Sequence, residues 1–249
     1  YDITIAQEIA VKNELADRFE ALFEITGQNH KQLSILNDQV PLTTPQPRDI
    51  NGWTNIAMER SLELISARNA LASAEQEINK QRAGHYPTLN IVGKKAYSDN
   101  SNSLLGATNT ETDSIGLQLD MSLFAGGRTS SQVKEATFLK IKAQQNMERQ
   151  RRSTLRQTRE AFLGVNAAIS RVNALKQALT SNESALEATE AGFEVGTRTI
   201  VDVLLSLREK FRAERDYAQS RYDYVIETLH LKQAAGVLAE SDIETVNGW

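Results

Sequence analysis

Arg198 and Asp202 place two opposite charges in one short turn of this 249-residue chain, on either side of Thr199. Thr199 and Asp202 have the Ser/Thr-x-x-Asp/Glu spacing of a capping box, in which each side chain accepts a backbone N–H at a helix start. Gly196 suits the left-handed position that ends the preceding helix. A cation before a helix start opposes the helix dipole, so this local scheme leaves Arg198 unexplained. Arg198 is therefore either solvated or paired with another hairpin or subunit.

Asp202 also has two interpretations. It is either only a capping residue or, in a tube of symmetric subunits, one member of an acidic ring that selects cations. Catalysis is not predicted, because His30, His85 and His230 are isolated without metal-ligand spacing and the chain has no cysteine. The sequence therefore predicts no enzyme and no cofactor.

The composition favours long helices with narrow apolar seams over a thick globular core. Aromatic residues make up 6% and charged residues 24% of the chain, and the mean hydropathy is -0.42. The net charge of -4 argues against nucleic acid as a partner. No stretch approaches the ~20 consecutive apolar residues that a membrane-spanning helix needs.

Apolar periodicity and turn residues divide the chain into segments. A helix is predicted over 1–26, and Gly27 suits its C-terminal end. The remaining segments are a proline-containing connector over 27–50, a helix over 51–84, a strand region over 85–127, a helical hairpin over 128–236 with its tip at 193–205, and a C-terminal segment over 237–249.

The strand region shows a clean period of two. Thr88 to Gly93 and Ile115 to Leu123 alternate apolar and polar residues, and a polar loop over 98–113 separates them. Strands of about ten residues around such a loop fit either a transmembrane β-hairpin or a soluble hairpin with one wet face. The apolar face consists of odd-numbered positions: Leu89, Ile91, Ile115, Leu117, Leu119, Met121 and Leu123.

The helical hairpin begins with a helix predicted from about Thr129 to Phe193, which is about 100 Å long at 1.5 Å per residue. Two offset apolar stripes run along it, so neighbouring helices are expected on both sides. The return helix is predicted from Thr199 to Ala235. Its expected seam is Val201, Leu204, Phe211, Ala218, Tyr222, Val225 and Leu229.

Two regularities relate the helices. The helix before the strands and the return helix, of about 32 and about 37 residues, together match the long helix, so they can stack end to end beside it. The helix end from Ala21 to Gly27 recurs from Leu229 to Gly236, as in an internal repeat. The first copy would be a return helix without its own long helix and strands, which predicts that the chain is a fragment.

The segment from Ala191 to Leu204 resembles the periplasmic helix turn of the TolC family of trimeric outer-membrane channels. The resemblance is stronger to the channel that gives the family its name than to its divergent drug and metal efflux ducts. It extends along nearly the whole chain through ordered landmarks: Ile25-Thr26-Gly27, Pro87-Thr88-Leu89, Gly126-Gly127, Ser131-Gln132-Val133-Lys134 and Tyr222-Asp223-Tyr224.

The resemblance implies a mainly α fold with a transmembrane β-hairpin. Three protomers would form an outer-membrane β-barrel and a long antiparallel α-helical barrel, the periplasmic tunnel. Segment 1–26 would be the return helix of the first repeat, and segments 27–50 and 237–249 would lie in an equatorial belt. The helix over 51–84 would lead to the barrel, the loop over 98–113 would be extracellular, and the seven odd-numbered apolar residues would face lipid.

The implied function is a passive exit duct for type I protein secretion or multidrug efflux, located in the outer membrane of a Gram-negative bacterium and reaching into the periplasm. The protein would assemble as a homotrimer. Its partners would be a periplasmic adaptor, an inner-membrane pump or ABC transporter, and membrane lipid. The site residues carried over are the gate links Arg198, Thr197 and Phe193, the acidic ring residue Asp202, and the adaptor-docking tip Val195, Gly196, Thr197 and Arg198.

Two positions depart from the family pattern. Phe193 stands in place of a tyrosine, and Leu205 in place of a second acidic ring residue. A gate with fewer polar links and a weaker ring is therefore expected. The alternative to a duct is a soluble helical scaffold, which explains the helical seams but not the alternating strands around a polar loop.

Overall fold

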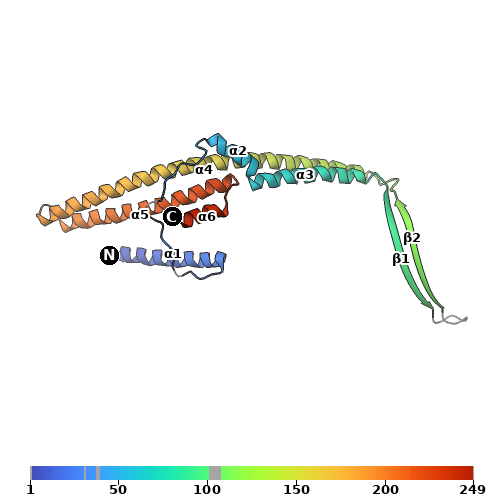
Figure 1. Ribbon diagram of the computed structural model, residues 1–249, viewed down its shortest axis with the longest axis horizontal. Coiled ribbons are helices and arrows are strands. Elements are labelled where there is room, and N and C mark those ends of the chain that lie inside the picture. Colours follow the sequence, from blue (N-terminus) through green and yellow to red (C-terminus); the bar gives the residue numbers. More distant parts are fainter. Residues whose placement is uncertain (1, 31, 38–39, 101–107, 249) are drawn as a thin grey trace. The chain divides into compact units, whose positions relative to one another are not determined.

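The computed structural model describes residues 2–30, 32–37, 40–100 and 108–248. The chain divides into two compact units, one of residues 1–43 with 243–249 and one of residues 44–242. Figure 1 labels the helices and strands of both units. None of the described helices has an apolar stretch long enough to cross a bilayer.

The smaller unit contains α1 (Asp2–Thr26), which confirms the first predicted helix. The helix ends where Gly27 adopts a φ of +66° and donates its N–H to the Phe23 carbonyl at 2.8 Å. This left-handed glycine removes the Cβ that would oppose the conformation, so the predicted stop signal acts as expected. The other helix, α6 (Glu240–Asn247), spans the boundary between the two units.

The single helix predicted over 51–84 is wrong, because the segment forms two helices, α2 (Ile50–Arg60) and α3 (Leu62–Ala83). The break lies at Ser61, whose ψ of 118° is not helical. Gly236 packs directly on the break: a Cβ built on it would lie 2.3 Å from the Arg60 carbonyl oxygen. The interruption therefore comes with a tertiary contact, and Ser61 by itself is not a helix breaker.

The larger unit is built on α4 (Arg128–Glu194), a continuous helix of 67 residues. α3 packs on its first part, where Lys140 pairs with Glu75 at 3.1 Å. α5 (Ile200–Ala234) packs on its second part, where the Thr189 and Ser206 hydroxyls lie 3.2 Å apart. Two shorter helices lie along α4 as predicted, but the one before the strands is the 22-residue α3, because α2 packs separately on α4 (Figure 1). The predicted length match is therefore confirmed only in part.

The seam between α4 and α5 is narrow and contains small residues. The predicted α5 seam is wrong, because Val225 is its one buried residue. Val201, Leu204 and Phe211 are each more than half exposed, and Tyr222 is 40% exposed. Small side chains let two helix backbones approach closely, and the larger apolar side chains then lie beside the contact. The buried residues of α5 are Ala213, Ser220, Arg221, Tyr224, Val225 and Leu231.

The strands β1 (Thr88–Asn100) and β2 (Thr108–Asp120) form an antiparallel pair of 13 residues each. Positions 98–100 and 108–113, predicted as loop, therefore belong to strands; Leu104 and Leu105 of the predicted loop lie outside the described residues. β-branched residues such as Thr110 and Thr112 favour extended structure, which accounts for the extra length. The second strand ends at Asp120, so Met121 and Leu123 follow it rather than lie in it.

Candidate functional site

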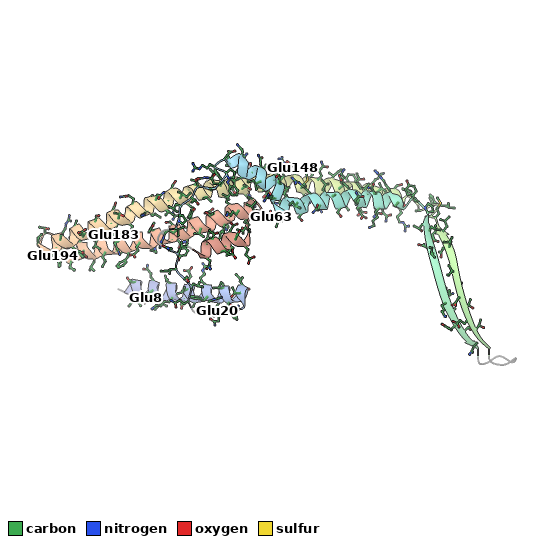
Figure 2. The ribbon with its side chains drawn as sticks, viewed as in Figure 1. Glu8, Glu20, Glu63, Glu148, Glu183 and Glu194 are labelled. Atoms are coloured by element: carbon green, nitrogen blue, oxygen red, sulfur yellow. The ribbon has the colours of Figure 1, made fainter. Side chains whose placement is uncertain are left out.

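The turn between α4 and α5 begins with a Schellman motif. Gly196 has a φ of +78°, its N–H donates to the Phe193 carbonyl at 2.9 Å, and the Thr197 N–H donates to the Gly192 carbonyl at 2.8 Å. These are the two hydrogen bonds that close a helix C-terminus around a left-handed residue. The predicted role of Gly196 is therefore confirmed. Glu194, the last residue of α4, is labelled at this turn in Figure 2.

The capping box at the start of α5 is also present. The Asp202 carboxylate accepts from the Thr199 N–H at 2.9 Å, and the Thr199 hydroxyl oxygen accepts from the Asp202 N–H at 3.3 Å. The backbone hydrogen bond from Thr199, followed by the one from its hydroxyl, lowers the pKa of Asp202 below its ordinary value. The positive charge of Arg198 lowers this pKa further.

Arg198 is exposed at the turn and forms no salt bridge with any residue that the structure describes. Its N–H donates to the Gly192 carbonyl at 3.1 Å, so its backbone is part of the C-terminal cap of α4. The turn thus leaves one guanidinium in an exposed side chain. Phe193 and Thr197 are exposed beside it, which brings the three predicted gate residues together.

An exposed apolar cluster surrounds the same turn, and the sequence reasoning missed it by assigning Val201 and Leu204 to the seam. Val195 is 75% exposed, although an exposed apolar side chain does not stabilise an isolated hairpin turn in water. These positions also have the helical spacing of a buried seam, so periodicity alone could not show that the side chains are exposed. The members of the cluster are Phe193, Val195, Ile200, Val201, Leu204 and Leu205.

The β-hairpin carries a second exposed apolar surface. Leu89 lies opposite Leu119, and Ile91 lies opposite Leu117, so these residues share one face of the sheet. All seven residues predicted to face lipid are exposed. Beyond the next pair on this face, Gly93 with Ile115, Lys95 forms salt bridges with Glu111 and, at 3.8 Å, with Asp113.

The other face of the hairpin is polar near the helices. The Asn90 amide donates to the Asp120 carboxylate at 3.3 Å, and the Gln118 amide donates to the same group at 3.0 Å. The sheet therefore separates an apolar face from a hydrogen-bonded face within one pair of strands. No group of three or more potential metal ligands occurs among the residues for which coordinates are described.

Long helices packed in pairs and a β-hairpin are the fold that this chain shares with solved outer-membrane channels. The family model described as Outer membrane efflux protein matches residues 53–237. The chain belongs to this family, and its location is the outer membrane.

Individual relatives agree with this assignment. The chain is 37% identical to Outer membrane protein TolC of Vibrio cholerae over 99% of its own length and 57% of that protein. It is 27% identical to the Alkaline protease secretion protein AprF of Pseudomonas aeruginosa over 99% of its own length and 52% of that protein. The chain thus spans about half the length of the curated relatives it matches.

A solved structure supports the fold. The MtrE outer membrane channel of Neisseria gonorrhoeae matches with a TM-score of 0.72 at 15% identity, over 95% of this chain and 54% of that one. Because the identity is low, this likeness concerns the fold alone. The mainly α fold with a β-hairpin, predicted from the sequence, is confirmed.

Proposed function

We propose that this chain is part of a passive exit duct of the outer membrane, in which three copies assemble into one channel. The β-hairpins would form a barrel in the membrane, and the helices would form a tunnel in the periplasm. The observation that carries the proposal is the exposed apolar face of the β-hairpin, which a soluble scaffold would leave in water. A family described by efflux and a relative named for protease secretion support export of drugs or proteins.

The turn between α4 and α5 would close the periplasmic entrance, with Arg198, Thr197 and Phe193 as link residues. The β-hairpin and the turn are connected to opposite ends of α4, which is about 100 Å long. They are therefore far apart along the hairpin. The exposed segment from Val195 to Arg198 would also receive a periplasmic adaptor that connects the duct to an inner-membrane pump or ABC transporter. Cross-linking from the turn in intact cell envelopes checks this contact, and an absence of adaptor cross-links contradicts it.

The Arg198→Ser variant should make the closed channel leak. Removing the guanidinium takes away the charge that the turn offers to a neighbouring hairpin, and a link between partly desolvated charges contributes more than an ordinary surface pair. The resting current of single channels in planar bilayers is expected to rise several-fold.

The matched control is Arg215→Ser, which removes an exposed arginine of α5 that pairs with the adjacent Asp216. This control should keep the resting current of the wild type. A closed-state current that is equal in the Arg198→Ser channel and the wild type would remove Arg198 from the gate.

Asp202 would form a ring of three carboxylates in the assembled channel, and the Asp202→Asn variant should weaken block by polyvalent cations. Repulsion within such a ring raises a pKa, whereas the capping hydrogen bonds lower that of Asp202. Because a lowered pKa keeps the carboxylate charged, block of the wild type should persist at the ordinary aspartate pKa of about 3.9 and be lost as the pH falls further, through the lowered pKa. Current recordings over this pH range check the expectation; equal block of both channels at pH 7 would place the ring elsewhere.

A further inference from the structure

The turn is organised around the carbonyl group of Gly192, in the last helical turn of α4. Three donors reach this one oxygen: the Thr197 N–H at 2.8 Å, the Arg198 N–H at 3.1 Å and the Thr197 hydroxyl at 2.9 Å. The main chain of Thr197 and Arg198, two of the three predicted link residues, is thereby folded back over the helix. Gly192 is consequently the residue against which Thr197 and Arg198 lie.

The side chain of Arg198 occupies the space that a Cβ would fill at this position. A Cβ built on Gly192 would lie 2.8 Å from the Cγ of Arg198 and 3.2 Å from the Thr197 hydroxyl oxygen. The Cγ atom is the second carbon of the side chain, so with the backbone unchanged it moves away by rotation about χ1, which redirects the whole guanidinium. A clash with the far end of the side chain would have no such effect.

The conformation of Gly192 itself does not require a glycine. Its φ is not positive, unlike that of Gly196, and glycine is unfavourable within a helix compared with alanine. What an added Cβ would meet at this place is therefore the side chain of Arg198, and not an unfavourable backbone conformation.

We infer that Gly192 is a positioning residue of the gate, which holds the stem of Arg198 against α4 and so sets the direction of its guanidinium. The effect on leakage rests on the proposed gating function, whereas the effect on the direction of Arg198 does not. The two parts can therefore be tested separately in the same set of variants.

The first test is a cryo-electron microscopy structure of the Gly192→Ala channel. Arg198 is expected to adopt a different χ1 rotamer, with its guanidinium displaced. The same rotamer as in the wild type would overturn the inference. Since alanine favours helix, the variant should fold, with a melting temperature equal to or above that of the wild type.

The second test is a double-mutant cycle on the resting current in planar bilayers. Arg198→Ala removes the Cγ with which the new methyl group would collide. If Gly192 acts through Arg198, each single variant raises the current several-fold and the double variant matches Arg198→Ala alone. A wild-type current in Gly192→Ala beside a leaky Arg198→Ala channel, or additive effects in the double variant, would overturn the inference.

Failure of the gating proposal gives a different pattern. If Arg198→Ala keeps the wild-type current, the proposed gate role of Arg198 fails, and the rotamer of Arg198 alone decides whether Gly192 positions it. Gly164→Ala is the matched control, because it makes the same substitution in α4 and its new Cβ would meet the Glu227 Oε2 atom, at 2.6 Å, at the mobile end of a long side chain. This control should change neither Arg198 nor the current.

Discussion

A Leu117→Arg variant is expected to abolish assembly of the channel in the outer membrane. Leu117 is 73% exposed on the apolar face of the β-hairpin, opposite Ile91. An arginine on the lipid face of a barrel costs about 2–4 kcal/mol near the bilayer midplane, and every protomer repeats this cost. The amount of heat-resistant trimer in outer-membrane fractions measures the effect.

The matched control is the neighbouring Gln118→Arg variant. Successive residues of a strand point to opposite faces, so this arginine joins the polar face with Asn90 and Asp120. The control channel should assemble close to the wild-type level. Equal assembly of the two arginine variants would contradict the assignment of the odd-numbered face to lipid.

The Gly236→Ala variant should lose more than about 3 kcal/mol of unfolding free energy, a loss of the size that backbone strain and overpacking produce together. Gly236 has a φ of +71°, which an L-residue adopts at a cost. The new Cβ would also lie 2.3 Å from the Arg60 carbonyl oxygen and 2.8 Å from the Ser61 nitrogen. These are backbone atoms, so no side-chain rotation relieves the contact. Denaturant unfolding of the purified protein measures the loss.

Gly196→Ala separates the two causes. Gly196 ends α4 with a φ of +78°, in the same motif as Gly236 ends α5, but a Cβ there meets no atom within 4 Å. Only the strain of about 1–2 kcal/mol should appear. Equal losses in the two variants would show that the contact between Gly236 and the break at Ser61 contributes nothing.

The turn could be predicted from the sequence because its partners are close together along the chain. Gly196, Thr199 and Asp202 act on backbone groups within a few residues, and those local motifs give the same structure in many contexts. The alternation in the strands was equally informative, since each face is defined by every second residue.

Features that depend on distant contacts could not be predicted in the same way. Nothing around Ser61 signals a helix break, because the feature that meets it, Gly236, lies 175 positions away. The prediction of the α5 seam failed for a related reason. Ala213 and Ser220 have little apolar area, yet they are buried at the contact, where small side chains fit. Periodicity ranks side chains by hydrophobicity, whereas the approach of two helices also selects for volume.

The turn at the end of the hairpin has a mechanical consequence. The backbone N–H groups from Val195 to Thr199 all donate hydrogen bonds, so the turn contains no loose residue that could serve as a hinge. A force on the turn is therefore transmitted to α4 and α5, and the turn moves with them as one rigid unit. At its other end, α5 stops next to the contact of Gly236 with Ser61, one length of α5 or about 50 Å from the turn. At that length, a tilt of a few degrees moves Arg198 by several ångströms without rearranging a single bond of the turn.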